Sequence, residues 1–120
     1  MKATKTLETV YLQSFITPTK EEDIVVYIAV DEHSQYVFEP FMAAPPKTDD
    51  DLITAIKTIV ENIFTDYNSE IHSDNTTIIT NLPEETHSTI KESNSNIQQV
   101  IFNSERTEKF TEPILVEMFA

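Results

Sequence analysis

His72 and Asp74 are the first pair of residues in this chain whose types and spacing could do chemistry. They belong to the segment IHSDN, in which an apolar residue leads into an acidic one, as at a strand end. Side chains two residues apart on a strand share a face, so the two could contact each other. Asp74 could ligate a metal, or it could cap the strand end by accepting a backbone hydrogen bond. His33 and His87 have no second histidine at metal-ligand spacing, so we expect no zinc site.

Ser14 is a second candidate, as a nucleophile. It lies in Leu7–Ile16, an apolar segment without helical spacing that predicts a strand. A serine nucleophile needs a base and oxyanion donors, and the sharp turn that presents such a serine in hydrolases uses glycine. The chain contains no glycine, so we interpret Ser14 as chemically inert.

An acidic triplet, Asp49–Asp51, opens the most regular segment of the chain. Apolar residues recur at three- and four-residue steps through Leu52–Tyr67, which predicts an amphipathic helix. Thr48 with Asp51 has the form of a capping box, and carboxylates are stabilised at a helix N-terminus. We therefore interpret the triplet as helix capping and not as a metal site.

Three strands precede this helix. Leu7–Ile16 is followed by Asp23–Val30, a nearly continuous β-branched run that should be buried on both faces, and then by Tyr36–Met42. Short links join the three segments, so we expect an antiparallel meander.

Strands and helices alternate after the first helix. We expect a short strand, a β-like segment that extends or follows it, a helix that begins with a proline in its first turn, and a fifth strand: Ser69–Ser73, Thr76–Thr80, the helix from Asn81, and Asn96–Phe102. The last segment, Thr111–Ala120, is compatible with a helix capped by Thr111 or with a strand, and we favour the helix. The predicted fold is one α/β domain over residues 1–120, with the order β-β-β-α-β-α-β-α and helices on both faces of a five-stranded mixed sheet.

The composition limits the function. The 120 residues carry a net charge of −13, with 8 basic residues against 21 acidic ones, and Arg106 is the only arginine. Such a surface repels phosphate, so an extended nucleic-acid interface is not expected. No apolar run is long enough to span a bilayer, and no cysteine is present, so we expect a cytoplasmic protein without membrane contact or thiolate metal sites.

The absence of glycine also excludes phosphate-binding loops and dinucleotide fingerprints. Turns that usually use glycine must be built from other residues. Asn, Asp and Ser tolerate such turns, and we expect them at Asp31–Gln35, Asn68–Glu70 and Asn94–Asn96.

Three short segments resemble the catalytic core of retroviral-type integrases and insertion-sequence transposases. IAVDEHSQYVF matches the D-x-x-S of that family at Asp31 and Ser34, with Gln35 where arginine is usual. KTDDDLITAIKTI resembles the opening of the family's first helix. HSDN resembles its H-S-D-x-G motif, with Thr76 in place of the glycine. The resemblance covers roughly residues 7 to 103 and implies an RNase H-like fold with the strand order 3-2-1-4-5.

The family works through three carboxylates that hold Mg²⁺ or Mn²⁺. Aligning Tyr11 with the family's aromatic residue places Ser14 at the first carboxylate position, Asp74 at the second, and Glu108 or Glu112 near the third, without the family's N-G-x-x-E context. A serine hydroxyl has no negative charge and cannot bridge two hard cations. The resemblance therefore implies a degenerate site with no confident catalytic residue and no expected metal, and capping becomes the favoured role of Asp74.

We accordingly expect a non-catalytic integrase-like domain that acts through protein contacts, with a basic partner or with itself. One alternative is a metal-dependent polynucleotidyl transferase that retains Asp74 with Glu108 or Glu112 and uses Mg²⁺ or Mn²⁺. A second is an acidic mimic of nucleic acid that occupies a partner's DNA site.

Overall fold

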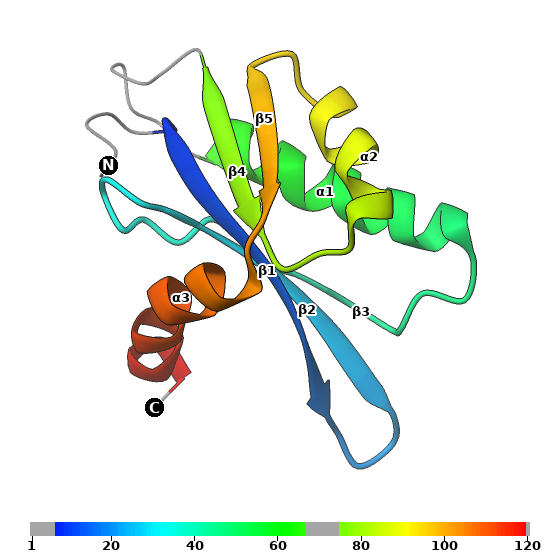
Figure 1. The fold of residues 1–120 in the computed structure, drawn as a ribbon. Coiled ribbons are helices and arrows are strands. Elements are labelled where there is room, and N and C mark those ends of the chain that lie inside the picture. The colour runs from blue at the N-terminus through cyan, green and yellow to red at the C-terminus, as the bar shows by residue number, and fades with distance from the viewer. Residues whose placement is uncertain (1–6, 67–74, 120) are drawn as a thin grey trace.

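The computed structural model of the protein describes residues 7–66 and 75–119. They form a five-stranded sheet with the order β3-β2-β1-β4-β5, covered by helices on both faces (Figure 1). The elements, in chain order, are β1 (Thr9–Pro18), β2 (Asp23–Asp31), β3 (Phe41–Ala43), α1 (Asp49–Asp66), β4 (Thr76–Thr80), the 3-10 turn η1 (Glu84–Thr86), α2 (His87–Glu92), β5 (Ile97–Phe102) and α3 (Ser104–Phe119).

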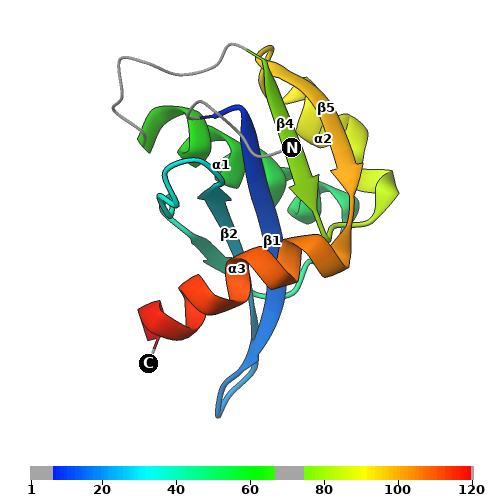
Figure 2. The same cartoon turned by 60° about the vertical axis from the view of Figure 1, so that its left-hand side comes forward.

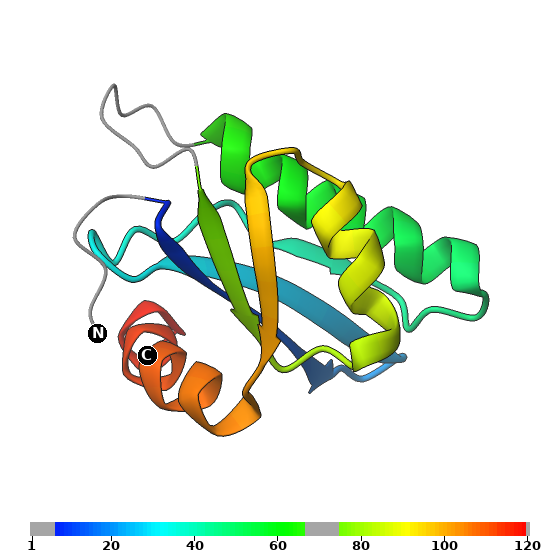
Figure 3. The ribbon, with the colours of Figure 1, turned by 45° about the horizontal axis from the view of Figure 1, so that its top comes forward.

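The sheet is mixed, as predicted. Strands β1, β2 and β3 pair antiparallel, whereas β4 lies parallel to β1 and β5 lies parallel to β4. The succession of strands and helices and the order of the strands are both those expected from the sequence. Helices α1 and α2 cover one face of the sheet, and α3 lies on the other face, where it crosses β1 (Figures 2 and 3).

The main core lies between the sheet and the helices α1 and α2. Buried apolar residues of α1 recur at helical spacing and meet alternate residues of β1, β2 and β4: Ala55, Ile56, Ile59, Val60 and Ile63 against Val10, Leu12, Tyr27, Ala29 and Ile78. Strand β2 is buried on both faces from Val25 onward, which confirms the prediction for that run. The nearly continuous β-branched run therefore forms an interior strand, with β3 on one side and β1 on the other.

The N-terminus of α1 is capped as the sequence indicates. The backbone N–H of Asp51 donates to the hydroxyl of Thr48 at 3.2 Å, and the Asp51 carboxylate accepts from the backbone N–H of Lys47 at 3.1 Å. These two bonds satisfy N–H groups at a helix end that have no partner within the helix. Asp51 therefore has a structural role at the helix end, and Asp49 and Asp50 lie beside it in the first turn.

The third strand is shorter than predicted. Only Phe41–Ala43 pairs with β2, and the earlier part of the predicted Tyr36–Met42 strand is reduced to a single bridge between Val30 and Val37. Pro40 lies between the two, and proline has no N–H to donate to a strand ladder. The prediction of one continuous strand was wrong for this reason.

The elements after α1 also differ in their bounds. The predicted strand Ser69–Ser73 lies outside the described residues, and Thr76–Thr80 forms β4. The second helix does not begin at Asn81, because Pro83 is extended (ψ 153°) and is followed by a 3-10 turn before α2 starts at His87.

The last segment is a helix, but it begins seven residues before the predicted cap, at Ser104 instead of Thr111. The side chain of Asn103 accepts a hydrogen bond from the backbone N–H of Arg106 at 2.9 Å, as an N-cap residue does. Thr111 is buried in the middle of α3, and Pro113 lies inside the helix instead of in its first turn. The capping asparagine was present in the sequence and was missed because Pro113 was taken as the start signal.

Candidate functional site

Strand β1 presents two different sets of side chains to the two layers of helices. Val10 and Leu12 belong to the core beneath α1. On the opposite face, Tyr11 stacks on Phe110 of α3, with ring centroids 4.3 Å apart, and Gln13 accepts a hydrogen bond from the hydroxyl of Thr111. Since side chains alternate along a strand, odd-numbered residues of β1 face α3 and even-numbered residues face α1.

The carboxylates that the sequence placed near a third catalytic position lie on the α3 side. Glu108 and Glu112 line a hollow of about 450 Å³ together with Gln13 and Phe15. Both Gln13 and Phe15 belong to β1, and Gln13 is the polar one of the two. Its side chain is a neutral, largely buried amide.

Ser14 lies on the other face of the sheet. Its cross-strand neighbour is Tyr27, a residue of the α1 core. Its backbone is held by Asn81, whose amide accepts from the Ser14 N–H and donates to the Ser14 carbonyl, both at 2.9 Å. The sheet thus separates Ser14 from Glu108 and Glu112, and the polar residue of β1 on their side is Gln13, one position earlier.

Asp74 and His72 lie outside the described residues. The strand seen after α1 begins at Thr76, so Asp74 precedes β4 in the chain. The position that follows the end of β4 is taken by Asn81, which contacts β1 through the bonds just described. The sequence analysis named Asn81 only as the start of a helix, and its position after the apolar run of β4 was the signal for a contact with β1.

The D-x-x-S segment has a structural explanation. The Asp31 carboxylate is fully buried and accepts three hydrogen bonds, from the backbone N–H of Leu7 at 2.7 Å and from the backbone N–H and hydroxyl of Ser34, both at 2.8 Å. The turn closes with a bond from the Gln35 N–H to the Asp31 carbonyl at 2.9 Å. The motif therefore joins the start of β1 to the turn after β2.

Leu7 and Gln35 adopt positive φ, at 64° and 60°. Among the described residues they hold the left-handed positions that were expected of Asn, Asp or Ser. Both lie beside Asp31, whose hydrogen bonds hold the backbone in this conformation.

A polar cluster joins β1, the turn after β2 and α3. The Tyr11 hydroxyl donates to the Glu32 carboxylate and accepts from Arg106 Nε at 3.0 Å, while Arg106 Nη2 lies 3.4 Å from Glu32 Oε2. Burial, followed by the bond to Glu32, raises the pKa of Tyr11 to about 12. Burial lowers the pKa of Arg106, but its contacts with Tyr11 and Glu32 outweigh this and raise it. The cluster fixes the start of α3 on β1, and Tyr11 and Arg106 hold their protons at neutral pH.

An apolar groove lies on the α3 side of the sheet, beside that helix. Phe15, Val26 and Met42 are direct neighbours across β1, β2 and β3. With Thr17 and Ile24 they line a hollow of about 390 Å³, which we call the sheet groove. Met42 is 62% exposed. The groove adjoins the hollow that contains Glu108 and Glu112, because Phe15 lines both.

Neither a metal cluster nor a membrane span is found in the described part of the chain. Residues 7–66 and 75–119 contain no group of three or more His, Asp or Glu side chains placed to hold a cation. None of the helices described there is both long enough and apolar enough to cross a bilayer.

Comparison with known proteins gives a structural similarity alone. No family model matches the chain, and no curated protein matches it. A chain in the cryo-EM structure of the simian T-cell lymphotropic virus intasome in complex with PP2A regulatory subunit B56 gamma superposes with a TM-score of 0.54 and 14% identity. The match covers 98% of this chain and 43% of that chain, so this protein spans less than half the length of its structural neighbour. At this identity the likeness concerns the fold, an α/β arrangement that also occurs in a retroviral intasome.

Proposed function

We propose that the protein is an RNase H-like, integrase-related domain that does not catalyse strand transfer and acts through contact with a basic protein. The strand order β3-β2-β1-β4-β5, the three short sequence motifs and the fold similarity to an intasome chain support the relationship. The observation that carries the functional part is the amide of Gln13, opposite Glu108 and Glu112 on α3.

The absence of a carboxylate at Gln13 argues against metal catalysis. Two hard cations bridged at one site need negatively charged oxygen ligands from more than one element. An amide supplies a neutral oxygen, and the Gln13 oxygen already accepts a hydrogen bond from Thr111. Glu108 and Glu112 belong to a single helix, so within residues 7–66 and 75–119 the hollow has carboxylates on one side only.

The sheet groove is the surface best suited to a partner. Its apolar floor is exposed at Met42, and carboxylates lie at both of its ends. Glu108 and Glu112 line the adjoining hollow. At the other end, Glu21 and Glu22 lie in the turn between β1 and β2, and Asp23 begins β2 just before Ile24. Lys20 is in the same turn, and the ammonium of Lys109 lies 3.2 Å from the carboxylate of Glu105 on α3. An apolar surface with acidic ends complements a segment that carries apolar and basic side chains.

If the missing carboxylate at Gln13 is what prevents metal binding, two matched variants should differ in their affinity for Mn²⁺. We expect no saturable Mn²⁺ binding at micromolar concentration in calorimetric titration of the unaltered protein. Gln13→Glu keeps the acceptor for Thr111 and adds a carboxylate beside Glu108 and Glu112, so this variant should acquire a measurable Mn²⁺ site. Ser14→Asp, on the opposite face, should not.

Tight Mn²⁺ binding by the unaltered protein that disappears in Asp74→Asn or Glu112→Gln would overturn the non-catalytic proposal and favour the transferase. Gain of binding in Ser14→Asp but not in Gln13→Glu would show that the assignment of faces is wrong.

Partner binding can be tested with a short synthetic amphipathic helix that carries lysine on one face and leucine on the other. We expect it to bind in roughly 150 mM salt, where surface charges are already screened beyond about 8 Å. Met42→Ser should weaken binding about tenfold, because it removes most of an exposed apolar contact. Ile16→Ser is the matched control, since Ile16 is 63% exposed against 62% for Met42 but lies on the opposite face.

Equal effects of the two substitutions would exclude the sheet groove as the contact surface. Duplex DNA should not bind, because the basic residues in the described part of the chain are distributed over separate elements. If binding of the lysine helix weakens with added salt but is unchanged in Met42→Ser, the contact is purely electrostatic, and the nucleic-acid mimic would be favoured.

A further inference from the structure

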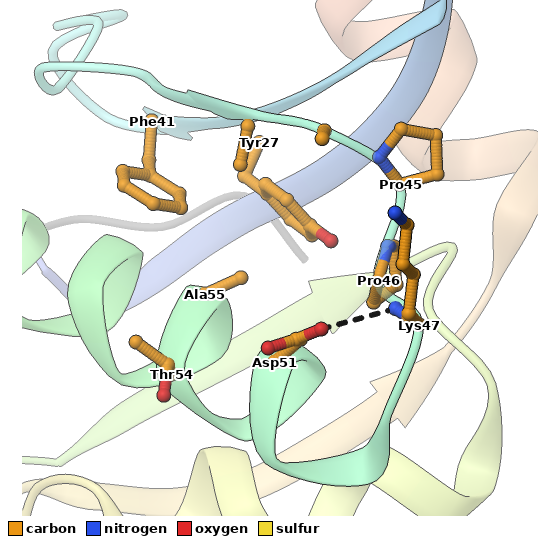
Figure 4. A pocket seen from close by; sticks show the side chains of 10 residues that line it. Tyr27, Phe41, Pro45, Pro46, Lys47, Asp51, Thr54 and Ala55 are labelled. Atoms are coloured by element: carbon orange, nitrogen blue, oxygen red, sulfur yellow. Dashed lines mark hydrogen bonds between the residues drawn. The ribbon is translucent and has the colours of Figure 1, made fainter.

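A pocket on the α1 side of the sheet lies between β3, the chain that leads from β3 to α1, and the first turns of α1 (Figure 4). Its volume is about 340 Å³, within the range of cavities that hold small molecules. It is separate from the sheet groove, which lies on the opposite face. Whatever it binds is therefore independent of the proposed protein contact.

The walls of the pocket are apolar and partly aromatic. The rings of Tyr27 and Phe41 lie 6.1 Å apart with an interplanar angle of 35°. Pro45 and Pro46 close the side opposite Phe41, and Ala55 of α1 forms part of the floor (Figure 4). Such walls suit a flat, uncharged ring.

The hydroxyl of Tyr27 gives the pocket a polar point. Tyr27 is only 2% exposed, and its hydroxyl points into the space between the prolines and Lys47 (Figure 4). The Tyr27 oxygen, unlike its ring, is reached from the pocket, because among the described residues only the Thr76 hydroxyl is buried without a hydrogen-bond partner. The Tyr11 hydroxyl has two, whereas that of Tyr27 has none among the residues the structure describes. Burial also raises the pKa of the Tyr27 phenol, so it stays protonated and can donate.

The charges at the mouth favour a neutral ligand. The Asp51 carboxylate lines the pocket, accepts from the Lys47 backbone N–H at 3.1 Å and keeps further acceptor capacity. Asp49 and Asp50 precede it at the same helix end, and the three carboxylates outnumber the cation of the lining, Lys47, so an anion is disfavoured. A donor group on the ligand could therefore face Asp51, while an acceptor faces Tyr27.

We propose that this pocket binds a small, uncharged aromatic or heteroaromatic molecule that carries an amide. The ring lies in the space bordered by Tyr27, Ala55 and Pro46, the amide oxygen accepts from Tyr27, and the amide N–H faces Asp51. The hydroxyl that lacks a protein partner is thereby satisfied.

Benzamide is the probe that tests this proposal. Titration into the isotope-labelled protein should shift the backbone NMR signals of Phe41, Ala43 and Ala55 in a saturable way. Tyr27→Phe keeps the ring and removes the hydroxyl, and it should weaken benzamide binding about fivefold, the value of one hydrogen bond. Tyr36→Phe, in the turn after β2, is the matched control and should leave the affinity unchanged.

Two further probes isolate the chemistry. Toluene, which lacks the amide, should bind the unaltered protein more weakly than benzamide does, and its affinity should be the same for Tyr27→Phe as for the unaltered protein. Benzoate, which is negatively charged, should also bind more weakly than benzamide. Because the hydroxyl has no protein partner, Tyr27→Phe should unfold at the same urea concentration as the unaltered protein, so a change in affinity is not a change in folding. Absence of saturable shifts with benzamide, or an equal affinity in Tyr27→Phe, would overturn the proposal.

Discussion

Replacement of Ile28 by alanine should lower the free energy of unfolding by about 2–5 kcal/mol, the usual cost of truncating a buried isoleucine. Ile28 is fully buried in β2, opposite Gln13 of β1, beneath the layer that contains α3. Its neighbours belong to paired strands and cannot collapse into the cavity without breaking the sheet. Urea denaturation followed by circular dichroism measures the change.

Ile16→Ala is the matched control for Ile28→Ala. Ile16 also lies in a strand, but it is 63% exposed, so its truncation should cost no more than about 0.5 kcal/mol. A loss below about half a kcal/mol for Ile28→Ala would show that the centre of β2 is not packed as described.

Asp31→Asn should destabilise the protein by about 2–4 kcal/mol, because it removes acceptors from buried donors. The carboxylate accepts from Leu7 on one oxygen and from Ser34 on the other. The asparagine NH₂ group must face one of these donors, so at least one buried N–H loses its partner. The midpoint of urea unfolding should fall while the slope stays the same.

Asp23→Asn, an exposed aspartate at the other end of β2, controls for the lost charge and should change stability little. Ser34→Ala removes the hydroxyl donor to Asp31 and an acceptor for the exposed Tyr36 N–H, and it should cost less than Asp31→Asn because no buried donor loses its partner. A small effect of Asp31→Asn, equal to that of Asp23→Asn, would mean that the carboxylate does not hold the turn.

The long regular elements were predictable because their own sequences carry the signal. The β-branched run of β2 and the helical spacing of α1 each extend over several residues, and both elements were found at close to their predicted positions. The capping of α1 by Thr48 was also legible, since it involves residues three apart in the chain. Local periodicity and local hydrogen bonds need no knowledge of the rest of the fold.

The bounds of the shorter elements were harder to predict because local signals conflict there. Pro113 indicated a helix start, yet Asn103 caps α3 and the helix continues through the proline. The residues of Tyr36–Met42 favour a strand, but Pro40 limits the pairing with β2 to the last part. Tertiary packing decides between such signals. Phe110 stacks on Tyr11 and Thr111 bonds Gln13, so the part of α3 that precedes Pro113 is held on β1 as a helix.

The sequence by itself determined that this is an acidic α/β domain with a mixed sheet, and that its first strand lacks a carboxylate at the position suggested by the integrase resemblance. Only the tertiary structure decided that Gln13, and not Ser14, faces Glu108 and Glu112, because a shift of one residue along a strand moves a side chain to the opposite face. It likewise decided that Asn81 follows β4 and binds the backbone of Ser14, a contact between residues 67 positions apart. Contacts over such distances depend on how the strands pair, and no local pattern in the chain encodes them.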